Sequence, residues 1–155
     1  MSKRPVPVTL RAVTTEDREQ LSAWYHDDQE GLEQFFGVEL PSEQEYVTQF
    51  NRLFEQMQQY TARMLMAELK QDLIGFVMVT DVPPTLEVGR VHIYLTPKKR
   101  RYVLRAVKAG IAEAEKMGIQ VLIQTVRASN TAAIKLSKKV GFLPSPVMTL
   151  IKELR

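Results

Sequence analysis

The stretch Asn130-Thr-Ala-Ala-Ile-Lys-Leu-Ser-Lys-Lys-Val-Gly-Phe142 follows an alternating apolar run from Gln120 to Val126. The run has the two-residue period of a strand. In the stretch after it, apolar side chains recur at helical spacing, and Asn130 is of a residue type that caps helix starts. A glycine just before Phe142 then ends the helix. The sequence therefore predicts a strand, a helix and a turn in the last third of the chain.

Apolar periodicity divides the rest of the chain in the same way. We expect further strands at 8–13, 63–69, 73–79, 88–95 and 147–154, and helices at about 15–27, 42–60, 100–117 and 130–140. The segment 28–41 carries two glycines and little periodicity, so it is predicted to be a loop with a short helical turn. This order of elements indicates an α/β fold, in which helices cover a mixed sheet.

The composition fits one globular domain. With 45% apolar and 25% charged residues in a chain of 155, disorder is a poor explanation, and no apolar run approaches the ~18 residues of a membrane span. The N-terminus does not resemble a secretory signal, so a cytoplasmic location is expected. The absence of cysteine excludes disulfides, thiolate metal sites and a cysteine nucleophile. The two histidines, His26 and His92, are not in a ligand spacing, so no metal site is expected.

The stretch quoted first resembles the closing strand, helix and turn of the GNAT family of N-acetyltransferases. The shared features are the Asn, an Ala-Ile-x-Leu face and the Gly-Phe pair, and the family's Tyr on this helix is replaced by Ser137. The element order matches along nearly the whole chain. The resemblance implies one GNAT-like domain over residues 1–155, with a mixed central sheet of about six to seven strands flanked by about four helices.

The resemblance also implies a site for acetyl-CoA between two splayed parallel strands. Family members hold its pyrophosphate on backbone N–H groups of a glycine-rich turn that opens the long helix. Here the turn corresponds to Arg100-Arg-Tyr-Val-Leu-Arg105, or to a register two residues earlier, and neither contains glycine. Asn130 is expected to cap its helix and to face the pantetheine arm. The expected cofactor-binding residues are Leu95, Lys98, Lys99, Arg100, Arg101, Tyr102, Val103, Arg105 and Asn130.

The consecutive cations from Lys98 to Arg101 allow three interpretations. They form a solvated helix edge, or they form an anion site, since positive potential there adds to the helix dipole. In the second case their side chains compensate for the missing glycines. A nucleic-acid site is the third and least expected interpretation, because no interleaved aromatic residues accompany the run.

Acetyl transfer needs a base, a donor for the oxyanion and an acid for the leaving thiolate. By resemblance, the oxyanion donor is a backbone N–H near Leu95, and the acid is the Tyr that Ser137 replaces. A serine hydroxyl is shorter and less acidic than a phenol. Tyr94 and Tyr102 are candidates to stand in for it.

Glu87, His92 and, less strongly, Glu68 are the candidate bases. Glu87 begins the strand predicted before Leu95, and His92 lies on the polar face of that strand. Each also has a purely structural interpretation, Glu87 as a solvated turn acid and His92 as a partly buried sheet histidine. The sequence alone does not assign a catalytic role to either residue.

The acceptor amine is expected over the segment 28–41. Glu30 and Glu33 suit a cationic amine, and Phe35 and Phe36 offer aromatic contacts, unless the two Phe pack into the core or against a partner. Two functions remain open at this stage. One is an N-acetyltransferase that acts on a primary amine through an atypical cofactor site. The other is a GNAT-fold protein without catalysis that binds protein partners or its own copies as a structural subunit.

Overall fold

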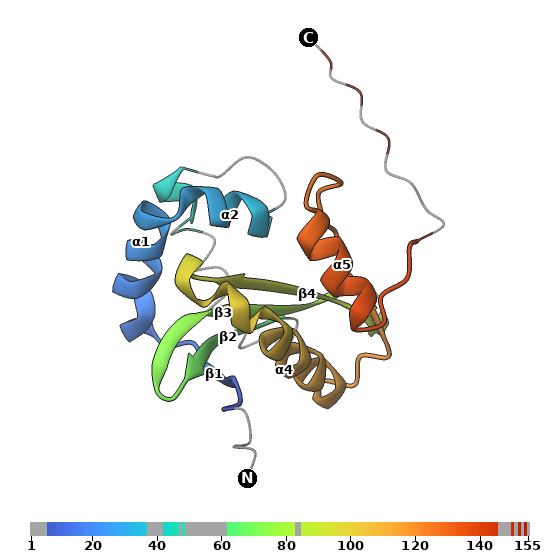
Figure 1. The fold of residues 1–155 in the computed structure, drawn as a ribbon, viewed down its shortest axis with the longest axis horizontal. Coiled ribbons are helices and arrows are strands. Elements are labelled where there is room, and N and C mark those ends of the chain that lie inside the picture. The colour runs from blue at the N-terminus through green and yellow to red at the C-terminus, as the bar shows by residue number, and fades with distance from the viewer. Residues whose placement is uncertain are drawn as a thin grey trace.

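The computed structural model describes residues 6–36, 42–46, 48, 62–82, 85–145, 150, 152 and 154. These residues form an α/β fold around one mixed sheet with the strand order β1-β2-β3-β4-β5 (Figure 1). The first three strand pairs are antiparallel and the pair of β4 and β5 is parallel. The strands are β1 (Thr9–Ala12), β2 (Ala62–Leu69), β3 (Asp72–Val82), β4 (Thr85–Leu95) and β5 (Val121–Ile123).

Helices separate and follow these strands. They are the 3-10 helices η1 (Thr15–Asp17) and η2 (Pro97–Tyr102) and the α-helices α1 (Arg18–Asp27), α2 (Gln29–Phe36), α4 (Val103–Lys116) and α5 (Thr131–Lys139). Gly118 follows α4 with a φ of +83°, the left-handed conformation predicted for the end of this helix. Within the described ranges, no helix is long and apolar enough to cross a membrane.

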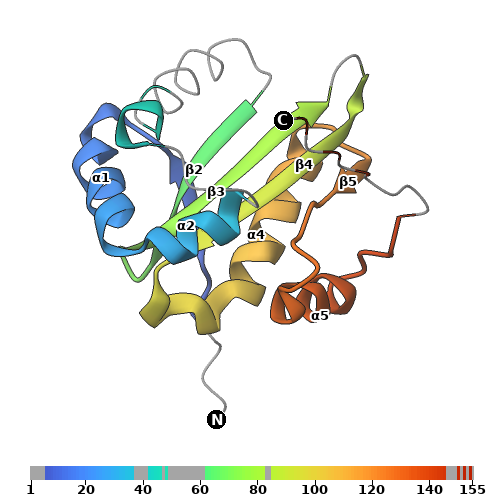
Figure 2. The same cartoon turned by 90° about the horizontal axis from the view of Figure 1, so that it is seen from above.

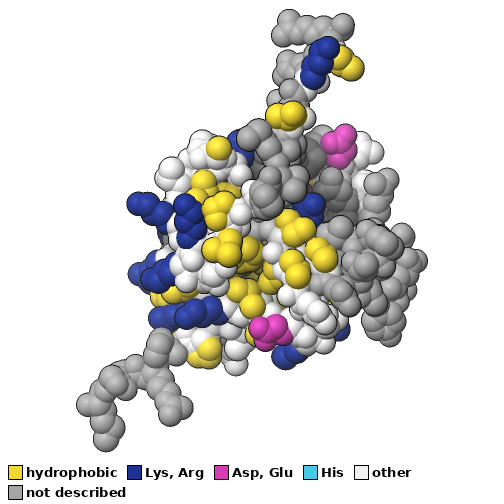
Figure 3. All heavy atoms as spheres, turned by 90° about the vertical axis from the view of Figure 1, so that its right-hand side faces the viewer, with side chains coloured by type: hydrophobic (Ala, Val, Ile, Leu, Met, Phe, Trp, Pro, Cys, Tyr) yellow, Lys and Arg dark blue, Asp and Glu magenta, His cyan; other side chains and the backbone are white. Residues whose placement is uncertain are grey.

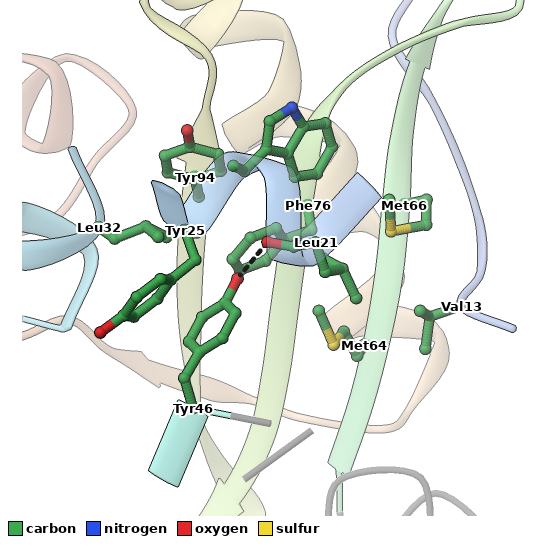
Figure 4. Close-up of a cluster of buried hydrophobic side chains, with 10 residues drawn as sticks. Val13, Leu21, Tyr25, Leu32, Tyr46, Met64, Met66, Phe76 and Tyr94 are labelled. Atoms are coloured by element: carbon green, nitrogen blue, oxygen red, sulfur yellow. Dashed lines mark hydrogen bonds between the residues drawn. The ribbon is translucent and has the colours of Figure 1, made fainter. Parts of the chain in front are cut away.

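Alternation along the strands gives the sheet two apolar faces. One face packs under α1 and α2, and Figure 4 shows its buried cluster, in which the Tyr46 hydroxyl donates to the Leu21 carbonyl at 3.1 Å. The opposite face packs against α4. Its residues, such as Val77 and Val91, alternate along the strands with those of the first face. The first cluster contains Val13, Leu21, Trp24, Tyr25, Leu32, Tyr46, Met64, Met66, Phe76 and Tyr94.

The hairpin predicted around residues 70–72 is confirmed. Lys70 and Gln71 form its two-residue loop, with φ angles of 49° and 72°. Two left-handed residues give the turn the twist that joins antiparallel strands. The pairing of β2 with β3 then runs from Leu69 opposite Asp72 to Ala62 opposite Thr80. A bulge between Ala67 and Glu68 shifts the register.

The structure corrects the prediction for residues 28–41. The described part of that segment is the helix α2, begun by Asp28, whose Oδ1 accepts the Gly31 N–H at 3.1 Å. Leu32 on this helix is fully buried. The glycine therefore lies inside a helix that burial and a good N-cap stabilise.

Two other predictions fall largely outside the described residues. The predicted helix at 42–60 begins as expected, because the Ser42 hydroxyl accepts the Glu45 N–H at 3.3 Å, but most of its length is not described. Most of the predicted strand at 147–154 is also not described, and Leu150, Lys152 and Leu154 lie in no strand.

Candidate cofactor and acceptor site

The parallel strands β4 and β5 pair over a short stretch and then separate. Their register runs from Val88 opposite Val121 to Arg90 opposite Ile123, after which the chain leaves β4 toward α5 (Figure 2). The Arg90 guanidinium donates to the Thr125 hydroxyl at 3.3 Å, at the point where the strands part. Among the described residues, the second half of β4 therefore has no strand paired on its β5 side, and we call this unpaired edge the gap.

On its other side, β4 stays paired with β3 to its end. Gly75 lies opposite Leu95, and the Thr96 N–H donates to the Ile74 carbonyl at 2.9 Å. Because backbone N–H groups alternate in direction along a strand, Ile93 and Leu95 direct theirs away from β3. These two N–H groups therefore point to the side from which β5 has departed, and the family resemblance implies an oxyanion donor near Leu95.

The chain after β4 turns at once into the 3-10 helix η2. Pro97 begins it, the Lys99 N–H donates to the Thr96 carbonyl at 2.9 Å, and the Val103 N–H donates to the Arg100 carbonyl. In a 3-10 helix each N–H is bonded three residues back. This turn therefore offers fewer open N–H groups than a glycine-rich loop, and what it presents instead is a set of cationic side chains.

Those cations have distinct surroundings. The Arg101 and Arg105 guanidinium carbons lie 4.8 and 5.2 Å from the centre of the Tyr102 ring, and the Lys99 ammonium lies 6.0 Å from it. Arg105 also donates to the Val6 carbonyl at 2.8 Å. Lys99 and Arg101 of η2 and Arg105 of α4 are thus gathered around one aromatic ring, whereas Arg100 turns toward α2.

Arg100 and Tyr94 meet at the carboxylate of Asp28. The Arg100 Nη2 and the Tyr94 hydroxyl each donate to the Asp28 Oδ2 at 2.9 Å. Burial, and next the bond to Asp28, raise the pKa of the Tyr94 hydroxyl, so it keeps its proton. Asp28 was not predicted as a site residue, and it lies 66 positions from Tyr94 in the sequence.

The candidate bases lie in two strands. His92 is half-buried in β4 opposite Met78, and burial followed by the charge of Arg90 lowers its pKa, so the ring is neutral at pH 7 and able to accept a proton. Glu87 lies in β4 near the edge shared with β5. Glu68 in β2 pairs with Arg11 of β1 at 2.7 Å. Because β3 separates β2 from β4, Glu68 lies apart from the other candidates.

Asn130 and Ser137 belong to α5, on the far side of the gap. The Asn130 Oδ1 accepts the Ala133 N–H at 3.2 Å, which confirms its predicted role as a cap. The Ser137 hydroxyl donates to the Ala133 carbonyl at 2.8 Å and contacts the Gln124 side chain just after β5. The residue that replaces the family's Tyr therefore ties α5 to the departing end of β5.

The surface between α4 and α5 is hollowed. Leu104, Lys108 and Ile111 of α4 face the end of α5 across a hollow of about 220 Å³, which Lys139 and Val140 close. Figure 3 shows the side of the molecule on which α5 lies, where apolar side chains gather at the centre and Lys and Arg side chains line one border. This side of the molecule combines apolar surface with positive charge.

Several solved structures are similar to this chain. RimJ from Mycobacterium smegmatis, in complex with CoA-disulfide, is 19% identical with a TM-score of 0.72, over 88% of this chain and 72% of that one. Spermidine N-acetyltransferase from Vibrio cholerae, in complex with CoA and spermine, is 18% identical with a TM-score of 0.68, over 90% and 82%. Aminoglycoside 6′-N-acetyltransferase from Acinetobacter haemolyticus is 15% identical with a TM-score of 0.67, over 95% and 99%.

At these identities the solved structures establish a shared fold. A comparison with curated protein sequences gave no match. A family model for the acetyltransferase (GNAT) domain matches residues 8–143, which is most of the chain and includes both β4 and α5. The chain therefore belongs to the GNAT family of acetyltransferases.

Proposed function

We propose that this protein transfers an acetyl group from acetyl-CoA to a primary amine, through a cofactor site in which cationic side chains replace the glycine turn. The observation that carries the proposal is the parting of β4 and β5 after Arg90, which leaves the N–H groups of Ile93 and Leu95 directed into a gap. Two proteins with similar structures, RimJ and the spermidine N-acetyltransferase, were solved with ligands that contain CoA, which supports CoA as a ligand here.

Transfer requires the amine nitrogen to bond to the thioester carbonyl carbon while the carbon–sulfur bond breaks. The Leu95 N–H is positioned to donate to the oxyanion that forms on the carbonyl oxygen. His92, neutral because burial lowers its pKa, is suited to take the proton that the amine loses, directly or through water. The thiolate needs a proton in turn, and Tyr102, half-buried in η2, is the better candidate donor, because the Tyr94 hydroxyl is buried and donates its proton to Asp28.

The cofactor phosphates are assigned to η2. Arg100 has a side chain that is 52% exposed, and Lys98 lies exposed one turn before α4. Side-chain cations bind phosphate through charge-assisted hydrogen bonds, without the close backbone approach that glycine permits. On the acceptor side, Glu30 and Glu33 of α2 favour a cationic amine.

Calorimetric titration with acetyl-CoA, alongside thermal unfolding, tests the proposal. Ligand at 100 times its dissociation constant is expected to stabilise the fold by roughly 2.7 kcal/mol, which raises Tm by several degrees. Lys98→Gln is expected to weaken binding, and Lys70→Gln, the same charge change on the β2–β3 hairpin, serves as the control. Absence of both heat and a Tm shift at millimolar acetyl-CoA would overturn the proposal.

A non-catalytic GNAT-fold subunit is the second candidate, and two observations favour it. The acid of the family is replaced by Ser137, whose hydroxyl is engaged within α5. Val121 and Ile123 of β5 are also 53% and 40% exposed, which leaves apolar surface for a partner. Such a protein would bind no acetyl-CoA and acetylate none of a panel of primary amines, such as spermidine, kanamycin and lysine peptides. Acetylation of any of these amines excludes this second candidate.

A further inference from the structure

Asp28 is the point at which three separate elements meet. Its Oδ1 accepts the Gly31 N–H of α2, and its Oδ2 accepts from Tyr94 at the end of β4 and from Arg100 in η2. The Asp28 side chain is 10% exposed, so these contacts are screened less by solvent than an ordinary surface ion pair. One carboxylate therefore holds the start of the acceptor-side helix to both the strand end and the phosphate turn.

The close approach of Arg100 depends on a glycine. A Cβ added at Gly31 would lie 2.4 Å from the Arg100 Nη2 and 2.2 Å from the Asp28 Oδ2. Any other residue at this position would push the guanidinium away from the carboxylate. The glycine in α2 thus serves the contact between α2 and η2.

Arg100 can hold Asp28 and an anion together. A guanidinium has five N–H donors in a planar fork, and the described contact with Asp28 uses the Nη2 end. With half of the side chain exposed, the remaining donors are accessible to a phosphate oxygen. A phosphate bound there would share its cation with the carboxylate that caps α2.

The structure also places a spectroscopic reporter at this junction. Trp24, the single tryptophan of the chain, lies one helical turn before Asp28, whose N–H donates to the Trp24 carbonyl at 3.0 Å. The Trp24 ring lies 5.7 Å from the Tyr94 ring, and Tyr94 bonds to Asp28. A change in the contacts of Asp28 is therefore expected to change Trp24 emission.

We propose that Asp28 is a positioning residue that, through Arg100, couples phosphate binding at η2 to the placement of helix α2 on the acceptor side. The inference rests on the proposed function, since it takes CoA as the anion. It makes the arrangement of the acceptor side depend on whether the phosphate turn is occupied.

Titration of the full chain with CoA, followed by calorimetry and by Trp24 emission, tests this coupling. In the wild type, CoA binding is expected to shift Trp24 emission. In Asp28→Asn, which keeps a side-chain acceptor for the Gly31 N–H, CoA should bind within about threefold of the wild-type affinity while the emission shift is lost. Arg100→Gln should weaken CoA binding about tenfold and abolish the shift even at saturation.

Matched variants separate coupling from loss of charge. Asp27→Asn changes the neighbouring exposed acid and should leave affinity and emission shift unchanged. Lys98→Gln removes a cation of the same turn and should weaken CoA binding yet keep the shift at saturation. If Asp28→Asn fails to fold by circular dichroism, Tyr94→Phe and Arg100→Gln carry the test, since Tyr94→Phe should also diminish the shift.

The outcomes separate this inference from the proposed function. No heat with CoA in the wild type overturns the proposed function and this inference with it. Heat without any Trp24 shift in the wild type, or with the same saturating shift in Asp28→Asn and Arg100→Gln, overturns the coupling alone.

Discussion

Two regions of the molecule differ sharply in how they are packed. The first, which we call the framework, consists of the described residues up to Ile119; the second, the closing segment, consists of residues 120–145. All five ion pairs between side chains that the structure records lie in the framework. Among the described residues, none after Ile119 is buried, and α5 buries no side chain.

The difference bears on how the candidate site is built. The framework supplies a rigid wall, because β4 is packed on both faces and hydrogen-bonded to β3 along its length. The closing segment supplies the opposite wall, attached through three parallel residue pairs of β4 and β5. Regions with few buried contacts open at low free-energy cost. A ligand in the gap would therefore stabilise mainly the closing segment.

Phe76→Ala is expected to have the largest effect. Phe76 is fully buried, and its ring contacts those of Trp24, at 6.1 Å, and Tyr94, at 5.1 Å, measured between ring centres. Its truncation should lower the free energy of unfolding by about 3–5 kcal/mol. The same change at the half-buried Phe142 should cost less than about 1 kcal/mol. Chemical denaturation of both variants checks the contrast, and equal losses would contradict it.

Asn130→Ala is expected to act locally. Loss of the bond from the Ala133 N–H to the Asn130 Oδ1 should destabilise α5 by about 1 kcal/mol. Amide hydrogen exchange in residues 131–139 should then quicken about fivefold, with exchange in β2 and β3 unchanged. Ser129→Ala is the control, because its side chain is not the cap. Slower exchange in α5 than in β3 of the wild type would refute the division into two regions.

The smallest expected effect is a pH dependence of the framework. Burial lowers the pKa of His92 from its ordinary 6.5, so the unfolded chain binds the proton at higher pH than the folded one. Stability should therefore decline as pH falls below about 6.5, and stop declining at the folded pKa of His92. Denaturation curves measured between pH 7 and 5 check this, because the decline begins near the unfolded pKa of about 6.5. His92→Gln should remove the decline.

Asp17 provides an internal contrast at lower pH. Its hydrogen bond with Arg11 holds the pKa of this carboxyl below its ordinary 3.8. The stability that it contributes is present above that value and is lost as pH falls through the folded pKa. If the stability of His92→Gln still declined as pH fell from 7 to 5, a group other than His92 would cause the effect.

Much of the fold could be predicted from the sequence. Alternation located the hairpin strands, and Ser42, Asn130 and Gly118 marked helix ends through local chemistry that acts within a few residues. The sequence pattern does not predict α2, because the segment 28–41 carries two glycines and little apolar periodicity. Asp28 at the cap position, three residues before Gly31, was the available signal.

The arrangement of the candidate site could be predicted only in part. Resemblance led to the gap beside Leu95 and to the basic turn, but the partner of Arg100 lies 72 residues away in sequence. No local pattern encodes such a contact, because it arises when α2 and η2 pack on the same strand end. The side-by-side placement of Lys99, Arg101 and Arg105 on the Tyr102 ring was likewise invisible in a run of charges.

The strand order has a consequence for how the chain folds during its synthesis. Because β1 to β4 are antiparallel and neighbours in sequence order, they can pair as soon as residue 95 has left the ribosome, and α4 follows to cover them. The parallel partner β5 comes after a crossover helix, so the pairing that borders the gap forms last. A nascent chain interrupted before residue 120 would have a nearly complete framework and no second wall for a ligand.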